Sequence, residues 1–326
     1  MNGPLVNNAP AADMAPPVRP RIGLALGSGS ARGLAHVGVL RALKEANIEG
    51  DLVAGTSMGA VIGAVFASGK IDGLSARLRN LDWQSIVALL DPVFPRSGLI
   101  DGQKITEFVR AHVPNTRIED LLLPFAAVAT DITNGAQVVA TAGDLTEAVR
   151  ASIAVPGIVT PVRSNGRILA DGGLVNPVPV SVARAMGADL VIAVDLNHDI
   201  VAGRLSRPVA RANGHAPIMA RLLESLQAIN SPVLAQFEAW LNKAPLEPLP
   251  GIFDVLLASL YIMQARVTEA ALQQDRPEIL IQPPLGAVRF MEFDRAEEII
   301  DIGYRSAVEQ LAHWTRTKTH EPGNGS

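Results

Sequence analysis

Cysteine is absent from the 326-residue sequence. Its absence excludes disulfide bonds, catalysis by a thiolate and zinc sites built on thiolates. The sequence also has no Gly-Lys-Ser or Gly-Lys-Thr run, so it lacks the phosphate-binding P-loop of nucleotide-hydrolysing proteins. It contains no calcium-binding pattern either. We therefore expect a protein that needs no metal ion and no cofactor.

Long runs of basic residues are also absent. The formal net charge is −4, and acidic and basic residues are mixed along the chain. Proteins that bind nucleic acid usually present a basic patch, so we expect no nucleic-acid partner. The composition is 48% hydrophobic and 18% charged, which provides enough apolar side chain for a substantial core and excludes wholesale disorder.

No segment resembles a signal peptide or a transmembrane helix. Residues 1–20 lack a basic start followed by an apolar run, and their prolines and small residues predict a flexible leader. The longest uncharged stretch, residues 52–69, contains several glycines and divides into the end of a strand and a helix. We interpret it as buried core. We expect a cytoplasmic protein, although the lack of cysteine also fits a periplasmic one.

Short apolar runs alternate with helical periods from residue 22 onward. Residues 22–26 predict a strand that leads into the glycine-rich turn 27–33, and the apolar spacing over 34–46 predicts a helix. The pattern repeats as a strand over 51–55 and a helix over 58–68. Two successive strand–turn–helix units are typical of an α/β fold with a parallel sheet.

Later segments continue the same alternation. Asp144 is placed to cap the N-terminus of the helix that follows it. Residues 199–217 are rich in Arg, Gly and Pro without periodicity, and they predict a mobile loop. The other predicted strands are 125–131, 136–141, 167–170, 190–195 and 278–282, and the other predicted helices are 144–154, 180–186, 218–241, 252–273 and 295–314.

The pentapeptide Gly55-Thr56-Ser57-Met58-Gly59 matches G-x-S-x-G at the junction of a predicted strand and a predicted helix. In that setting the serine lies on a tight turn, where larger flanking residues would clash. The new helix directs its free N–H groups and the positive end of its dipole toward this serine. We therefore predict that Ser57 is a nucleophile, and the alternative is a glycine-lined packing turn.

The turn at residues 27–33, Gly-Ser-Gly-Ser-Ala-Arg-Gly, is a second candidate site. Small residues allow its backbone N–H groups to converge on an anion. That anion could be the oxyanion of an ester under attack, or the phosphates of a dinucleotide in a non-catalytic nucleotide- or anion-binding protein. The dinucleotide pattern G-x-G-x-x-G fails at Arg32, and the serine elbow lies one βα unit away, so the oxyanion is favoured. A helix-capping turn is the remaining alternative.

Asp171 precedes Gly172 and Gly173 after a short predicted strand. An aspartate before two glycines is usually a turn residue. The apolar residues of 151–162 and 173–180 would line this turn, and an apolar lining raises the pKa of a carboxyl group above its reference of about 3.9. A raised pKa would make Asp171 a better proton acceptor for a serine hydroxyl.

Histidine is the more usual base, so the six histidines compete with Asp171 for this role. His36 lies in the first turn of the helix after the glycine-rich loop, where local packing is the simpler interpretation. His198 follows a predicted strand and would complete the order Ser57, Asp171, His198 of an α/β-hydrolase triad. That fold usually has more strands before its nucleophile than the two found here. The triad is therefore the alternative to a Ser57–Asp171 dyad.

The three motifs, in this order, resemble those of the patatin-like phospholipases, especially the bacterial single-domain members related to neuropathy target esterase. The family pattern is a Gly-Gly-Gly-x-Arg/Lys-Gly loop, then G-x-S-x-G, then Asp-Gly-Gly/Ala. These motifs fall here on residues 28–33, Ser57 and Asp171, with serines at positions 28 and 30 in place of two glycines. Residues 150–156, 176–179 and 293–304 resemble further family segments.

The resemblance implies a three-layer α/β sandwich over residues 21–315, with a mostly parallel central sheet and helices on both faces, and a polar tail over 316–326. It implies a serine acyl-ester hydrolase that uses a Ser57–Asp171 dyad without histidine. The substrate would be a phospholipid, a lysophospholipid or another fatty-acyl ester. The implied oxyanion donors are backbone N–H groups near Gly29 and Ser30 and that of Met58. Arg32, also in this oxyanion loop, would meet a lipid phosphate or the developing anion, and the alternative for it is a structural ion pair.

Residues 252–263 are apolar nearly all round, a pattern that normally indicates a buried helix. The alternatives are a lipid-facing surface, which would give peripheral membrane contact, and a homodimer interface. In the first case the preceding Arg204, Arg207 and Arg211 would favour anionic headgroups. The resemblance does not extend to residues 199–250, so it does not transfer the lipid specificity.

Overall fold

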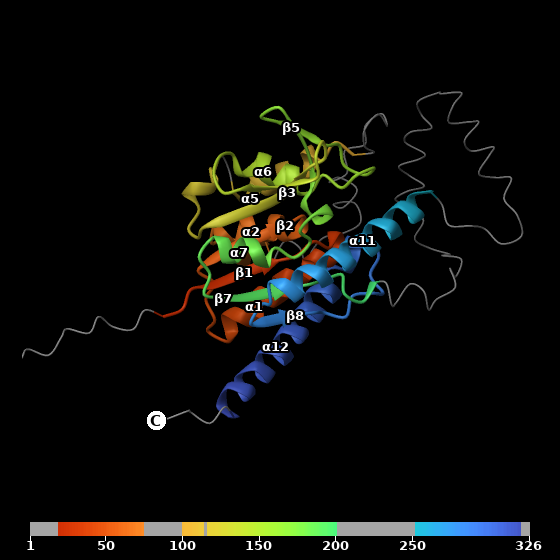
Figure 1. Ribbon diagram of the computed structural model, residues 1–326. Coiled ribbons are helices and arrows are strands. Elements are labelled where there is room, and N and C mark those ends of the chain that lie inside the picture. Colours follow the sequence, from red (N-terminus) through yellow and green to blue (C-terminus); the bar gives the residue numbers. More distant parts are fainter. Residues whose placement is uncertain (1–18, 75–99, 114–115, 201–251, 321–326) are drawn as a thin grey trace, which may run out of the picture.

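The computed structural model describes residues 19–74, 100–113, 116–200 and 252–320 (Figure 1). The predicted helix 218–241 lies outside these ranges, as do all but the ends of the predicted leader 1–20 and the predicted loop 199–217. The described residues form one sheet with helices on both faces, which confirms the predicted three-layer α/β architecture.

Eight short strands form the sheet: β1 (Ile22–Leu26), β2 (Leu52–Thr56), β3 (Phe125–Asp131), β4 (Ala136–Ala140), β5 (Val162–Ser164), β6 (Arg167–Asp171), β7 (Leu190–Val194) and β8 (Ile279–Ile281). Their order is β5-β6-β3-β2-β1-β7-β8, with β4 paired to β3. The central run from β3 to β8 is parallel, whereas β4, β5 and β6 pair in antiparallel fashion. The sheet is thus mixed but mostly parallel.

Helices cover both faces of the sheet (Figure 1). One face carries α1 (Ala35–Glu45), α2 (Met58–Ala67), α5 (Gln103–His112), α6 (Leu145–Ser152) and α12 (Ala296–His320), and the other carries α7 (Val180–Ala185) and α11 (Ile252–Gln274). Successive side chains of β1 point to opposite faces of the sheet. Leu24 and Leu26 belong to the hydrophobic cluster on the first face, and Ala25 belongs to the cluster on the second. Strands buried on both faces therefore read as continuous apolar runs.

Most predicted element boundaries in the described residues agree with the structure to within two residues. Asp144 caps α6, since its side chain accepts the Glu147 N–H at 2.9 Å. Helix α12 extends to His320, beyond the predicted end at residue 314 and into the predicted tail. The strand β5 and the helix α5 were not predicted. A three-residue strand is too short to show a period, whereas α5 carries a helical apolar spacing at Ile105, Phe108 and Val109.

Candidate active site

Ser57 occupies a sharp turn between β2 and α2. Its backbone has φ 56° and ψ −123°, and residues other than glycine are strained at such a positive φ. The flanking glycines permit the turn: a Cβ on Gly55 would lie 2.5 Å from Gly59 O, and a Cβ on Gly59 would lie 2.1 Å from Leu26 O. The structure therefore places Ser57 in the elbow that the sequence predicts.

Hydrogen bonds hold the Ser57 backbone on both sides of its Cα. The N–H donates to Ser152 Oγ at 2.9 Å, and the carbonyl accepts the N–H groups of Ala60 and Val61 at 2.9 and 3.2 Å. Ser57 is only 6% exposed and lines an apolar cavity. The nucleophile candidate therefore faces the interior of the protein rather than bulk solvent.

The cavity next to Ser57 has a volume of about 110 Å³. Its walls are aliphatic, methionine and phenylalanine side chains from α2, α5 and the segments 153–159 and 290–293. Among the described residues that line it, Ser30 and Ser57 are the only ones with a polar side chain. An apolar hollow with a few polar groups at one place is typical of small-molecule sites. This hollow suits a hydrocarbon chain whose polar end lies near Ser57.

The glycine-rich loop lies against the elbow. It connects β1 to a short 3-10 helix, η1 (Ser30–Leu34), and a Cβ on Gly33 would lie 2.1 Å from Met58 Cγ. Ser30 and Met58 line the same cavity as Ser57. The loop and the elbow therefore share one wall of the cavity, and the structure brings together Ser30, Met58 and Ser57 as predicted.

Two backbone N–H groups of the loop are available to an anion. The N–H groups of Ser28, Ala31 and Arg32 are already used, because they donate to Pro177 O, Phe290 O and Gly29 O. Within the part of the chain that the structure describes, the N–H groups of Gly29 and Ser30 have no acceptor. The hydrogen bonds thus identify these two amides by elimination.

Ser30 adopts a left-handed conformation with φ 48°. Its Oγ donates to Phe290 O at 2.6 Å, and the same carbonyl accepts the Ala31 N–H at 3.1 Å. A glycine would adopt this φ without strain, so the serine needs the extra tether. The departure from the family loop at position 30 therefore keeps the turn and ties it to Phe290.

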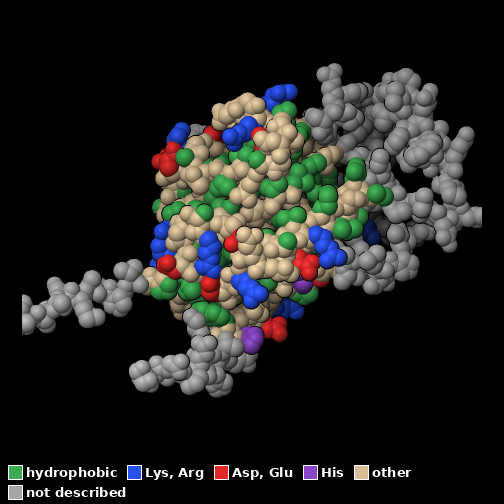
Figure 2. All heavy atoms as spheres, in the orientation of Figure 1, with side chains coloured by type: hydrophobic (Ala, Val, Ile, Leu, Met, Phe, Trp, Pro, Cys, Tyr) green, Lys and Arg blue, Asp and Glu red, His purple; other side chains and the backbone are tan. Residues whose placement is uncertain are grey.

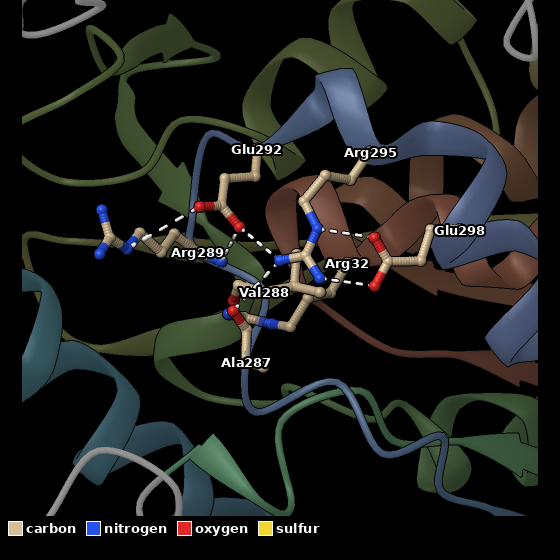
Figure 3. A network of polar contacts seen from close by, with 7 residues as sticks. All are labelled: Arg32, Ala287, Val288, Arg289, Glu292, Arg295 and Glu298. Atoms are coloured by element: carbon tan, nitrogen blue, oxygen red, sulfur yellow. Dashed lines mark hydrogen bonds and ion pairs between the residues drawn. The ribbon is translucent and has the colours of Figure 1, made fainter. Parts of the chain in front are cut away.

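Arg32 is completely buried and does not line the cavity. One of its guanidinium nitrogens donates to Val288 O at 2.9 Å, and the guanidinium lies 4.6 Å from the centre of the Tyr261 ring, a cation–π geometry. Figure 3 shows Arg32 beside the ion pairs that Arg295 makes with Glu292 and Glu298. No acidic side chain in the described residues bonds Arg32 itself. The structure therefore gives Arg32 a structural tether and not the predicted ion pair.

Asp171 is the last residue of β6 and is 2% exposed. Its N–H donates to Ala154 O at 2.9 Å, and its carbonyl accepts the Thr130 hydroxyl at 2.8 Å. In the side chain, Oδ1 accepts the Gly173 N–H at 2.7 Å, whereas Oδ2 has no hydrogen bond of standard geometry to any described residue. One carboxylate oxygen is thus fixed, and the other can accept a proton.

Burial raises the pKa of the Asp171 carboxyl to about 6. Hydrogen bonding from the Ser57 hydroxyl and from the Gly173 N–H acts in the opposite direction and lowers the pKa. The Ser57 hydroxyl is therefore close enough to act on the carboxyl, although the contact does not reach standard hydrogen-bond geometry. Both observations fit a Ser57 hydroxyl that lies next to the carboxyl group without a hydrogen bond of standard geometry.

The register of the sheet explains why these two residues meet. Thr56 pairs with Val128 on one side of β3, and Asp171 pairs with Ala129 on the other side. Ser57 follows Thr56 directly, so the nucleophile candidate and the carboxylate flank neighbouring residues of the same strand. The carboxyl ends of strands are where α/β sheets usually carry their ligand sites.

The two histidines considered from the sequence do not join this pair. His198 is exposed, and no hydrogen bond links it to Ser57 or Asp171 among the described residues. His36 is fully buried, and burial lowers its pKa to about 4. Its neutral ring makes a 2.8 Å hydrogen bond through Nε2 to Gly27 O, so it donates to the start of the glycine-rich loop. His36 is thus a packing residue, the simpler of its two interpretations.

Ser152 is the polar contact of Ser57 that sequence reasoning missed. It lies in the segment 150–156 that resembles the family, but the motif itself assigns it no role. Within the described residues, no three histidine, aspartate or glutamate side chains gather closely enough to hold a metal ion.

Comparison with known proteins identifies the family. A family model described as patatin-like phospholipase matches residues 24–184, the range that contains the glycine-rich loop, Ser57 and Asp171. An uncharacterized NTE family protein of Mycobacterium tuberculosis is 35% identical over 90% of this chain and 91% of the relative. The chain belongs to the patatin-like phospholipase family. Its predicted relation to the NTE proteins is confirmed by the same match.

Other known proteins show weaker or shorter similarity to this chain. Human patatin-like phospholipase domain-containing protein 6 is 32% identical over 90% of this chain, which corresponds to 20% of that protein. Among solved structures, VipD from Legionella pneumophila matches 90% of this chain and 67% of its own, with a TM-score of 0.45 and 14% identity. Membership of the family supports a lipid esterase or phospholipase activity in general terms.

Proposed function

We propose that this patatin-like protein is a serine acyl-ester hydrolase in which Ser57 is the nucleophile and Asp171 is its base. The observation that carries the proposal is the pairing of a strained elbow serine with a buried carboxyl whose pKa is raised to about 6. A carboxylate with such a pKa is ionised at neutral pH and still accepts a proton readily. The apolar cavity beside Ser57 supplies a place for the acyl chain.

The reaction has two acyl-transfer steps. Asp171 Oδ2 takes the proton of the Ser57 hydroxyl while Oγ bonds to the ester carbonyl carbon. The carbon–oxygen bond to the alcohol then breaks, and Asp171 returns the proton to the leaving alkoxide. A water molecule loses a proton to Asp171 and attacks the acyl-serine carbonyl. The bond to Ser57 Oγ then breaks, Asp171 returns the proton to Oγ, and the fatty acid is released.

The negative oxygen of each tetrahedral intermediate needs donors, and three N–H groups are suited to the role. Gly29 and Ser30 supply free amides, and Met58 supplies the first amide of α2 at the positive end of its dipole. The fully buried Arg32 supports the loop from behind through Val288 and Tyr261. Loss of one oxyanion donor typically raises the barrier by about 3 kcal/mol.

The substrate class follows from the cavity and the family. A fatty-acyl ester, whether a phospholipid, a lysophospholipid or a simpler ester, presents the hydrocarbon chain and the carbonyl that the cavity and the free amides accommodate. The cavity is fitted to the chain and not to a headgroup, because its described walls carry no charged side chain. Short acyl esters of p-nitrophenol should therefore serve as test substrates.

We also propose that α11 rests on a lipid surface. By length and composition alone, Val255–Gln274 could cross a membrane, and 22% of its apolar window is buried. Val255, Leu256, Ile262 and Met263 are each about half exposed, and hydrophobic side chains are visible along this part of the molecule in Figure 2. The inner face of the same helix packs with cavity-lining residues through Tyr261. The exposed apolar face therefore belongs to a helix whose inner side packs against residues of the cavity wall.

A flotation experiment tests this surface. Wild type should float with vesicles of phosphatidylcholine and phosphatidylglycerol, and Ile262→Gln/Met263→Gln should not. Val139→Gln, which removes an exposed apolar side chain on β4, is the matched control and should float. Unchanged flotation of the double variant overturns the proposal. If the double variant still floats but its oligomeric state is altered, the exposed face is a homodimer interface instead.

Hydrolysis of p-nitrophenyl butyrate tests the proposed function. Ser57→Ala and Asp171→Asn are expected to lose at least about 1,000-fold in kcat, because the nucleophile or its base is removed. Ser68→Ala and Asp131→Asn are matched controls: Ser68 lies at the other end of α2, and Asp131 is a buried aspartate at the end of β3. Both controls should keep their turnover. Retained turnover in Asp171→Asn would exclude the dyad and return His198 to consideration.

A further inference from the structure

The end of α6 and the residues directly after it contact both proposed catalytic residues. Ser152 Oγ accepts the Ser57 N–H at 2.9 Å. Two residues on, Ala154 O accepts the Asp171 N–H, also at 2.9 Å. One short segment therefore holds the backbone of the nucleophile and the backbone of the base.

Ser152 is itself anchored to the centre of the sheet. Its Oγ donates to Val128 O at 2.6 Å, and the residue is completely buried. A hydroxyl that donates one bond and accepts another has both roles fixed. Val128 O also lies 2.2 Å from where a Cβ on Gly172 would be, so the turn after Asp171 rests on the same carbonyl. The elbow, through Ser152, and the turn after Asp171 therefore both pack against the same atom of β3, the carbonyl oxygen of Val128.

We propose that Ser152 is a positioning residue that sets the approach of Ser57 to Asp171 by tethering the elbow N–H to β3. The inference rests on the proposed function. The strained elbow is the reason that a tether is needed, since a backbone at φ 56° relaxes unless its surroundings hold it. Ser152 also occupies the Ser57 N–H, so this amide is withheld from the oxyanion and the donors remain those of Gly29, Ser30 and Met58.

The same segment separates positioning from substrate binding. Ile153 and Val155, which alternate with Ser152 and Ala154, line the cavity. Ile153→Ala should therefore raise KM for esters with longer acyl chains, because it removes wall contacts. Ser152, which does not line the cavity, should act on kcat instead.

The proposal predicts a defined kinetic change in Ser152→Ala. The kcat for p-nitrophenyl butyrate should fall about 10- to 100-fold while KM changes less than about twofold, since small displacements of reacting groups have effects of this size. The acid limb of the pH–rate profile should also move to higher pH. The Ser57 hydroxyl lowers the pKa of Asp171 in the wild type, and a displaced elbow would remove that effect.

Two further variants complete the test. Ser68→Ala removes a hydroxyl that donates to Val65 O at the other end of α2, and it should leave kcat and the acid limb unchanged. Ser152→Cys keeps the side-chain shape with a weaker donor and acceptor, so its kcat should fall between those of wild type and Ser152→Ala. If Ser152→Ala does not fold, Ser152→Cys is compared with wild type and Ser68→Ala in its place.

The outcomes separate this inference from the proposed function. Loss of activity in Ser57→Ala together with wild-type kcat and an unmoved acid limb in the Ser152 variants overturns the positioning role alone. Equal activity of wild type and Ser57→Ala overturns the proposed function, and the inference with it. The tether is supported if the Ser152 variants show both a lower kcat and an acid limb shifted to higher pH, while Ser68→Ala shows neither change.

Discussion

The Thr56 hydroxyl donates a 2.8 Å hydrogen bond to the backbone carbonyl of Asn176. Thr56 directly precedes the nucleophile, and Asn176 lies five residues after the proposed base. The bond is buried and joins segments 120 residues apart in the sequence. This hydrogen bond links the strand before Ser57 to the turn after Asp171. A second contact, from Ser152 to β3, holds the same pair of residues.

Activity should rise with pH through about 6, the pKa to which burial raises the Asp171 carboxyl. The carboxylate is the active form, so kcat/KM should fall about tenfold for each pH unit below this value, as one ionisation requires. The pH–rate profile of p-nitrophenyl butyrate hydrolysis measures the limb directly. A profile flat down to about pH 4.5 would contradict a base with this pKa.

The same carboxyl should lower stability as pH rises. Its folded pKa, about 6, lies above the ordinary value of 3.8, so the folded state binds more protons between these values. The penalty is absent below the lower value and complete above the upper one, at about 3 kcal/mol. Asp171→Asn should therefore gain up to about 3 kcal/mol relative to wild type between about pH 3.5 and about pH 7 in urea unfolding.

The pH dependence of wild-type stability also contains a contribution from His36, so the effect of Asp171 must be measured as the difference between Asp171→Asn and wild type. Burial lowers its pKa to about 4, so its contribution to stability is lost as pH falls through the same range, opposite in sign to that of Asp171. The two contributions offset each other in the wild-type curve. The difference between Asp171→Asn and wild type cancels the histidine, and a difference independent of pH would contradict the raised carboxyl pKa.

Gly59→Ala should damage the elbow. The new Cβ would lie 2.1 Å from the carbonyl oxygen of Leu26, a backbone atom that cannot move without shifting β1. We expect a loss of about 1–3 kcal/mol in unfolding free energy and a much larger fractional loss of kcat. Gly73→Ala, whose Cβ would meet nothing within 4 Å, should match the wild type in both thermal unfolding and turnover.

Ser30 should respond differently to glycine and to alanine. Ser30→Gly removes strain worth about 1–2 kcal/mol at φ 48° but also removes the tether to Phe290 O, so its unfolding free energy should change little. Ser30→Ala keeps the strain and loses the tether, and it should be destabilised by about 1–2 kcal/mol. Chemical denaturation separates them, and equal effects of the two changes would show that the strain is not significant.

Ser57 and Asp171 could be singled out as candidates from the sequence because each lies in a short contiguous motif. The elbow needs small residues next to the serine, and the aspartate turn needs glycine. These steric requirements produce short residue patterns that can be recognised in the sequence. The parallel part of the sheet was visible for a similar reason, since buried strands are continuous apolar runs. In the antiparallel part β4 and β6 were predicted but β5 was not, because β5 has only three residues and pairs only with its neighbour β6.

Long-range contacts of residues outside the three motifs, or not assigned a role by them, could not be predicted. Ser152 lies 95 residues from Ser57, and only the pairing of β2 with β3 brings them together. The family resemblance implied the amides near Gly29 and Ser30, but that the neighbouring N–H groups of Ser28 and Ala31 are occupied by Pro177 O and Phe290 O follows only from the structure. Arg32 shows the same limit: the expected contacts were a lipid phosphate, the developing anion or an ion pair, whereas its guanidinium lies over the ring of Tyr261, which belongs to α11.

The most direct test of the account is peptide mass spectrometry of the protein after reaction with a fluorophosphonate, which forms a stable adduct with an activated serine. A Ser57–Asp171 dyad predicts one adduct, on Ser57, that forms quickly in wild type, at least about 100-fold more slowly in Asp171→Asn and not at all in Ser57→Ala. Labelling of another serine, or equal labelling rates at Ser57 in wild type and Asp171→Asn, would contradict the Ser57–Asp171 dyad.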